Sequence, residues 1–210
     1  MHYARILTIE AQETFKTEVL EPLVEQAEQK KIHLFFVDAA HFVMLPFLGY
    51  LYSLTVRFIK AASGRQRFSV LGALNAITKE VVTITDHGYI NAMSVCALLQ
   101  KLHDGFPDLP IVLIMDNARY QRCLLVAEKA LELKIQIIFL PPYSPNLNLI
   151  ERLWKFVKKK VLYNQYYPLY LLFHKAISEC LDQTATTYKQ DLDTLLVPKF
   201  QSFKNTTIQP

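Results

Sequence analysis

The sequence predicts an α/β domain in which helices cover both faces of a mixed sheet. Three strand-like segments come first, at 32–38, 68–77 and 81–85, and the short link 78–80 between the last two indicates an antiparallel hairpin. Strand and helix then alternate along the chain, which is typical of parallel strands joined by helical crossovers. One of these later strands, at 111–115, is a continuous apolar run, as expected of a central strand covered on both faces.

The remaining elements follow from hydrophobic spacing and from chain breakers. In the first thirty-odd residues apolar side chains recur at helical spacing, and we expect a helix that forms the end of an interdomain connector. Segment 46–52 is predicted to be irregular because Gly49 interrupts it, and the proline-rich segment 141–145 is predicted to be extended. The other predicted elements are helices at 91–102, 120–133 and 148–162, a strand at 135–140, and a weaker helical region at 169–197.

Composition limits the class of protein. The 210 residues are 51% hydrophobic and 20% charged, which is typical of one globular domain and not of a disordered chain. The formal net charge of +4 is compatible with nucleic acid as a partner. Three widely spaced cysteines without a CxxC pair argue against a disulfide framework and a thiolate zinc site, and they fit a reducing cytoplasm. The apolar runs are shorter than the ~20 residues that cross a bilayer, and no signal peptide is recognisable, so we expect a soluble cytoplasmic protein.

Three carboxylates mark the candidate site. Asp38 and Asp116 end predicted central strands, and Glu151 opens the helix that follows the proline-rich connection. Strand ends and the start of the next helix can converge at one edge of an α/β sheet, where ligand sites are favoured. Converging carboxylates suit hard divalent cations such as Mg²⁺, and two such ions about 3.5–4 Å apart can catalyse phosphoryl transfer.

Each of these residues also has a plain structural alternative. A single Asp at a strand end is commonly a turn or cap residue, and Asn148 with Glu151 matches the capping box of a helix. We expect Asn148 to be that cap and to support the site from outside it. Asn117, next to Asp116, could tune a metal ligand through a hydrogen bond, but an Asx-turn explains it equally well.

The patterned blocks around the carboxylates carry a resemblance to a known family. They are Phe36-Val-Asp-Ala-Ala40, Ile114-Met-Asp-Asn-Ala118 and Leu140-Pro-Pro-Tyr-Ser-Pro-Asn-Leu-Asn-Leu-Ile-Glu-Arg-Leu-Trp154. Together, with thirty-four residues between Asp116 and Glu151, they resemble the DDE transposases of the mariner superfamily, in particular the bacterial insertion-sequence branch called the six-thirty family. The resemblance runs from about residue 10 to residue 175.

This resemblance implies a fold and an activity. The fold would be RNase H-like, and each active site would use two Mg²⁺ or Mn²⁺ ions, with Asp38 bridging both, Asp116 binding one and Glu151 the other. The activity would be cleavage of DNA at the element ends, by water, and joining of the freed 3′-hydroxyls to target DNA, usually at TA. The partners would be the element ends and the target DNA, and the enzyme would be a homodimer that acts on the bacterial nucleoid.

The resemblance also implies a domain division. Residues 1–31 would be a helical interdomain connector, 32–175 the DDE catalytic domain and 176–210 a C-terminal helical extension. Full-length members carry an N-terminal helix-turn-helix region that recognises the element ends, and this chain starts just before the catalytic core. We therefore expect that a separate N-terminal DNA-binding polypeptide could supply end recognition.

A basic segment follows Glu151. Arg152, Lys155, Lys158 and Lys159 are predicted to contact DNA phosphates beside the metals, the alternative being a solvated helix face.

Two other functions stay open for the chain as a whole. It could be a catalytically inert transposase remnant that binds DNA or a partner protein, or a different RNase H-like nuclease that cuts hybrids or junctions. Substrate preference would separate the second of these from a transposase.

Overall fold

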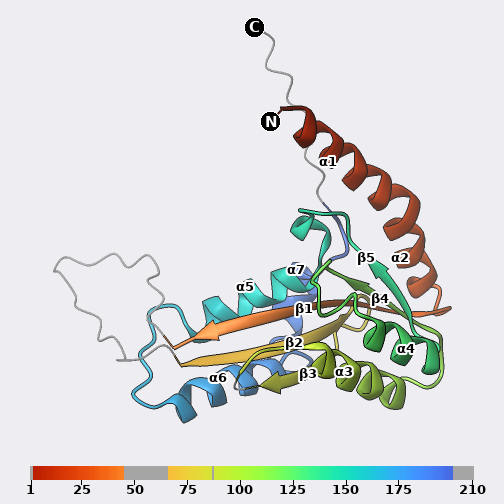
Figure 1. Ribbon diagram of the computed structural model, residues 1–210. Helices are drawn as coiled ribbons and strands as arrows, with labels where there is room; N and C mark the ends of the chain where they lie inside the picture. The colour runs from red at the N-terminus through yellow and green to blue at the C-terminus, as the bar shows by residue number, and fades with distance from the viewer. Residues whose placement is uncertain (1, 45–65, 87, 201–210) are drawn as a thin grey trace, which may run out of the picture.

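The fold is built on one mixed sheet, whose strands are labelled in Figure 1. The computed structural model describes residues 2–44, 66–86 and 88–200. The strands are β1 (His33–Val43), β2 (Arg67–Asn75), β3 (Val81–Asp86), β4 (Ile111–Met115) and β5 (Gln136–Phe139). They lie in the order β3-β2-β1-β4-β5, with β1, β2 and β3 antiparallel and β1, β4 and β5 parallel. The mixed sheet predicted from the sequence is thus confirmed.

Helices cover both faces of this sheet. They are α1 (His2–Phe15), a π-helix η1 (Lys16–Leu20), α2 (Glu21–Glu28), α3 (Ala92–Gly105), α4 (Leu124–Glu132), a 3-10 turn η2 (Pro145–Leu147), α5 (Ile150–Val161), α6 (Tyr170–Asp182) and α7 (Lys189–Leu195). One hydrophobic core joins α3 and α4 to one face of the sheet, and another joins α2, α5, α6 and α7 to the other. Figure 1 shows α1 extending away from the sheet.

The strand pleat and the helix period decide which side chains enter which core. On β1, Phe35 and Val37 lie in the core under α3 and α4, whereas Phe36 between them lies in the opposite core. On α5, Trp154 and Val157 are buried among the second set of helices. The lysines of α5 lie outside this buried face, so the helix has one apolar face and one basic face.

Some boundaries differ from the predicted ones because tertiary contacts decide them. β1 continues past Asp38 to Val43, since its second half pairs with β2. The helix predicted at 120–133 begins only at Leu124, because the amide of Gln121 bonds the Ala118 carbonyl in a turn and Cys123 is extended. The weaker helical region at 169–197 contains two helices, α6 and α7.

The first and last segments of the chain share one core with the sheet. Val24 of α2, Ile177 of α6 and Leu192 of α7 all belong to the core that contains Phe36. The segment 46–52, predicted to be irregular, lies outside the described residues. None of the described helices is long and apolar enough to cross a membrane.

Candidate active site

The structure brings the three predicted carboxylates to one cavity. Asp38 lies in β1 just after its last pair with β4, Asp116 directly follows β4, and Glu151 lies in the first turn of α5. All three line a cavity of about 410 Å³ at this edge of the sheet. Asn117 and Asn148 line the same cavity, as does the loop 140–145.

Asp38 is the most electrostatically perturbed of these carboxylates. Its pKa is raised from 3.8 to about 7, first because it is buried, and then because of the nearby charges of Glu151 and Asp116. The Ala39 amide and the Trp154 indole donate hydrogen bonds to the carboxylate and partly oppose the rise. This environment disfavours an isolated negative charge and would favour a cation that offsets it.

Asp116 and Asn117 fix the turn that follows β4. A carboxylate oxygen of Asp116 accepts a hydrogen bond from the Ala118 amide at 3.3 Å, which closes an Asx-type turn. The Asn117 amide donates to the Leu140 carbonyl, at the end of β5. Asn117 therefore does not form the Asx-turn itself, and it ties together the two chain segments that form the cavity wall.

Asn148 does not cap α5, and this prediction is wrong. The capping position is occupied by Leu149, and no side chain bonds the free amides of the first turn. The side-chain amide of Asn148 instead donates to the Val37 carbonyl at 3.2 Å. The short 3-10 turn before Asn148 aims its side chain at β1, so it links the start of α5 to the residue before Asp38.

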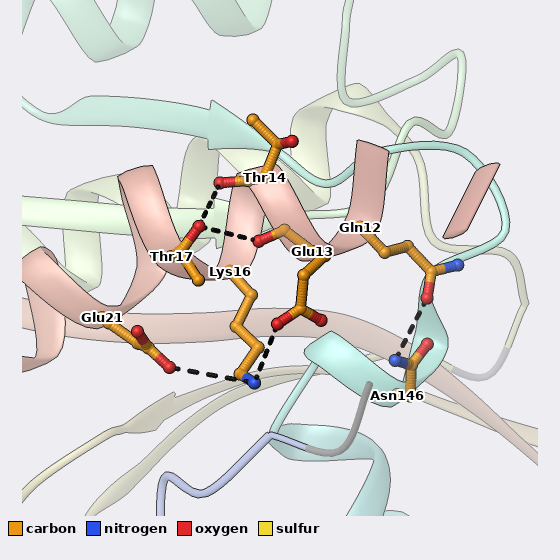
Figure 2. Close-up of polar contacts among 7 residues, drawn as sticks. All are labelled: Gln12, Glu13, Thr14, Lys16, Thr17, Glu21 and Asn146. Carbon is orange, nitrogen blue, oxygen red and sulfur yellow. Dashed lines mark hydrogen bonds and ion pairs between the residues drawn. The ribbon is translucent and has the colours of Figure 1, made fainter. Parts of the chain in front are cut away.

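The loop that follows β5 is held by a residue of α1 that the sequence analysis did not identify. The Gln12 side chain is buried, its amide donates to the Tyr143 carbonyl at 3.0 Å, and its oxygen accepts from Asn146 at 3.3 Å. Figure 2 shows Gln12 reaching Asn146. Tyr143 has a left-handed backbone (φ 58°) and is 89% exposed as a residue. Because these partners lie more than 130 positions apart, no local pattern could reveal them.

The predicted DNA-binding residues fall into two groups. Arg152 donates to the backbone carbonyls of Leu195, Val197 and Lys199 at 3.4, 2.8 and 2.6 Å, so it holds the C-terminal segment against α5. Lys155 and Lys159 are exposed and line a groove of about 750 Å³ between α5 and α7.

The other two lysines of this segment are less available to a ligand. Lys158 is half-buried on α5. Lys160 pairs with Asp191 at 3.3 Å and lies over the ring of Tyr188. The free positive charge of the groove therefore comes mainly from Lys155 and Lys159.

The donor set of the cavity fits divalent cations. Carboxylate oxygens are the preferred ligands of Mg²⁺ and Mn²⁺, and Asp38, Asp116 and Glu151 supply them from three separate elements. In the described ranges no three acidic, histidine or cysteine side chains stand close enough to form a ready-made metal site.

Comparison with known proteins identifies the fold. A strand transfer complex of Mos1 superposes with a TM-score of 0.62 at 13% identity, covering 90% of this chain and 58% of that one. A structure of the Mos1 transposase catalytic domain with raltegravir and Mg gives 0.58 at 12% identity, covering 92% and 96%. A simian T-cell lymphotropic virus intasome gives 0.53 at 14% identity, covering 85% and 60%. The predicted RNase H-like fold is confirmed by these likenesses.

Sequence comparison identifies the family. Among curated protein sequences none matches this chain. The chain spans 58% of the length of the Mos1 protein in the strand transfer complex. The family model described as DDE superfamily endonuclease matches residues 33–169, which is well over half of the sequence and includes all three carboxylates. The chain therefore belongs to the DDE superfamily endonucleases.

Proposed function

We propose that this chain is the catalytic domain of a DNA transposase of the mariner superfamily, in the bacterial insertion-sequence branch called the six-thirty family. It would cleave DNA at element ends and join the freed 3′-hydroxyls to target DNA at TA sites. The observation that carries the proposal is the meeting of Asp38, Asp116 and Glu151 in one cavity of a DDE endonuclease domain.

The three carboxylates would hold two divalent cations. Asp38, Asp116 and Glu151 would each supply carboxylate oxygens to these ions. When bound, the ions would lower the pKa of the attacking hydroxyl and stabilise the leaving oxygen. That hydroxyl, from water or from a DNA 3′ end, forms a bond to phosphorus as the bond to the 3′-oxygen breaks, and the leaving oxygen ends as a 3′-hydroxyl. No side chain is needed as a covalent nucleophile.

Two neighbouring asparagines would hold the three carboxylates in position. The bond from Asn148 to the Val37 carbonyl fixes α5, and hence Glu151, against the strand that carries Asp38. The bond from Asn117 to the Leu140 carbonyl fixes the turn after Asp116 in the same way. Such supporting bonds matter because small errors in position cost large factors in rate.

We assign the DNA phosphate contacts to Lys155, Lys158 and Lys159. They lie one or two turns after Glu151 on α5, and a cation there would meet phosphates beside the acidic cavity. Arg152, predicted with them, has its guanidinium engaged by the C-terminal segment.

The proposed function also implies how the chain would assemble with DNA and with partner chains. The similar structures include a Mos1 strand transfer complex and a viral intasome. We propose that this chain acts as a homodimer on the bacterial nucleoid, with a separate N-terminal DNA-binding polypeptide supplying end recognition. In this scheme 1–31 is the connector, 32–175 the catalytic domain and 176–210 the C-terminal extension.

A joining assay tests the proposed function. The purified chain is incubated with pre-nicked element-end oligonucleotides and a TA-containing plasmid, with Mg²⁺, Mn²⁺ or EDTA. We expect joining that requires the metal and falls at least about a thousandfold in Glu151→Gln, because a metal ligand is lost. The matched control Glu179→Gln, which removes an exposed carboxylate from α6, should join like the wild type.

Two outcomes would contradict the proposal. Metal-dependent cutting of RNA–DNA hybrids or junctions without joining would identify a different RNase H-like nuclease. DNA binding with neither cutting nor joining, even after an N-terminal DNA-binding polypeptide is added, would identify an inert remnant.

A further inference from the structure

The indole of Trp154 contacts the carboxylate that lies deepest in the site. Trp154 lies three residues after Glu151 on α5 and is only 2% exposed. Its Nε1–H donates to Oδ2 of Asp38 at 3.0 Å. A buried indole N–H needs an acceptor, and here the acceptor is a predicted metal ligand instead of a backbone carbonyl.

Gly72 makes room for this indole. It lies on β2 directly opposite Asp38 in the β1–β2 register. A Cβ atom on Gly72 would lie 2.7 Å from Cη2 and 2.9 Å from Cζ2 of Trp154, and 3.1 Å from Cδ1 of Ile150. Real Cβ atoms essentially never come within 3.0 Å of another heavy atom, so any other residue at this position would push the indole away.

The rest of the indole environment fixes its plane. The Phe42 ring, further along β1, meets the indole edge to face, with centroids 6.1 Å apart and planes at 81°. The indole thus lies against the backbone of Gly72 on the side of the sheet, and the Phe42 ring packs against it from a second side. Held in this plane, its N–H points toward Asp38.

We propose that Gly72 and Trp154 form a positioning pair for Asp38. The indole N–H fixes Oδ2 and so sets the plane in which the Asp38 carboxylate meets a cation in the cavity. A neutral donor is suited to this role, because it orients the carboxylate without cancelling the negative charge that a cation needs. Gly72 acts through Trp154, and neither residue touches the reacting atoms. The inference rests on the proposed function, which makes Asp38 a metal ligand.

A purely structural role for Trp154 predicts something different. If the indole only filled space, a side chain of the same shape without the N–H would leave the metal site unchanged. Trp154 is the only tryptophan in the sequence, so an N–H-free isostere such as benzothienylalanine, incorporated in place of tryptophan, changes this position alone. Trp154→Phe makes a similar change with natural chemistry.

The test measures Mn²⁺ binding to the full chain, by electron paramagnetic resonance of free Mn²⁺, together with the unfolding temperature in EDTA. We expect the isostere, Trp154→Phe and Gly72→Ala each to weaken Mn²⁺ binding about tenfold, the lower end of the effect of losing a bond to a metal ligand. The control Phe173→Leu, in the same core but away from Asp38, should lower the unfolding temperature without changing Mn²⁺ affinity. The isostere should keep the wild-type circular dichroism, so its readout does not depend on the other variants folding.

The outcomes separate this inference from the proposed function. If the wild type binds Mn²⁺, Asp38→Asn abolishes binding and the isostere binds like the wild type, the positioning role is overturned and the proposed function stands. If the wild type does not bind Mn²⁺, or Asp38→Asn binds equally well, the metal role of Asp38 fails and both are overturned.

Discussion

Asp38 occupies an unusual position for a carboxylate. It lies in a central strand, is largely buried, and has Glu151 and Asp116 as its charged neighbours. Burial and these like charges raise its pKa from 3.8 to about 7, so between these two pH values the folded chain holds a proton that an exposed aspartate would have lost. Keeping these carboxylates together therefore costs the folded chain stability when Asp38 is ionised.

This environment predicts how stability depends on pH. The pKa of Asp38 is about 7 in the folded state against an ordinary 3.8, so the folded state binds more protons than the unfolded state between these values. The free energy of unfolding should therefore fall as pH rises from about 4 to about 7, by an amount on the order of a few kcal/mol, and level off above. Urea unfolding in EDTA across this range measures it.

The comparison for this experiment is Asp38→Asn, which cannot titrate. Its stability should lack that decline, and the gap to the wild type should widen toward neutral pH. Two parallel curves would show that Asp38 titrates normally in the folded chain.

At the residue scale the sequence was informative where the chemistry of a residue follows from its place in the chain. Asp38 and Asp116 could be predicted because each directly follows an apolar run of the sequence, and the structure gathers both with Glu151 in one cavity. Gly72 and Trp154 could not, because their contact depends on the register of β2 against β1 and on how α5 lies over it. Asn148 was assigned to a local cap, although its bond is made to a strand 111 positions away.

At the scale of elements, helix α1 contacts a loop that lies more than 130 positions away in the sequence. Gln12 holds the backbone and a side chain of the loop between β5 and α5, which forms a wall of the acidic cavity. The same helical segment also carries local ion pairs, of Lys16 with Glu13 and Glu21, which Figure 2 shows. Gln12 thus joins α1 to the wall of the acidic cavity.

Gln12→Ala should loosen that loop. Two hydrogen bonds are lost, at a cost of about 1–2 kcal/mol, and the Tyr143 carbonyl loses its donor. We expect faster amide hydrogen exchange in 141–147 and joining slowed about tenfold, because the cavity wall is less well positioned. Exchange followed by mass spectrometry measures the first effect.

Thr17→Ala is the matched control for this change. The Thr17 hydroxyl bonds only the carbonyls of Glu13 and Thr14 within its own helical segment, as Figure 2 shows. It should leave exchange in 141–147 at the wild-type rate. Equal protection of the loop in both variants would mean that Gln12 does not restrain it.

Element order was predictable from the sequence, and element ends were less so. Every strand in the described sheet matches a predicted segment, because alternation and apolar runs are local signals. The extension of β1 to Val43 and the late start of α4 at Leu124 were missed, because pairing with β2 and the turn at 118–122 are set by the folded sheet. The π-helix at Lys16–Leu20 likewise has no signature that the sequence analysis detected.

Considered whole, the molecule places an acidic cavity and a basic groove along one helix. Glu151 lies at the start of α5 on the cavity, and Lys155 and Lys159 line the groove further along. DNA bound with a phosphate at the cavity would run past these lysines. Affinity that depends on them should then depend on salt, because each phosphate contact releases counterions.

Each lysine should therefore account for part of the salt dependence. In fluorescence anisotropy titrations with element-end DNA, Lys155→Ala and Lys159→Ala should each reduce the slope of log affinity against log salt by about 0.9. Lys129→Ala, on α4 at the other face of the sheet, should leave the slope unchanged. An unchanged slope in both groove variants would place the DNA elsewhere.

The central claim is that Asp38, Asp116 and Glu151 together bind divalent cations. Anomalous X-ray diffraction from crystals of the full chain soaked in Mn²⁺ tests it most directly. We predict anomalous peaks in the cavity, with carboxylate oxygens of all three residues at about 2 Å, and loss of a peak in Glu151→Gln. A cavity without a peak at saturating Mn²⁺, or peaks held only by other groups, would contradict the account.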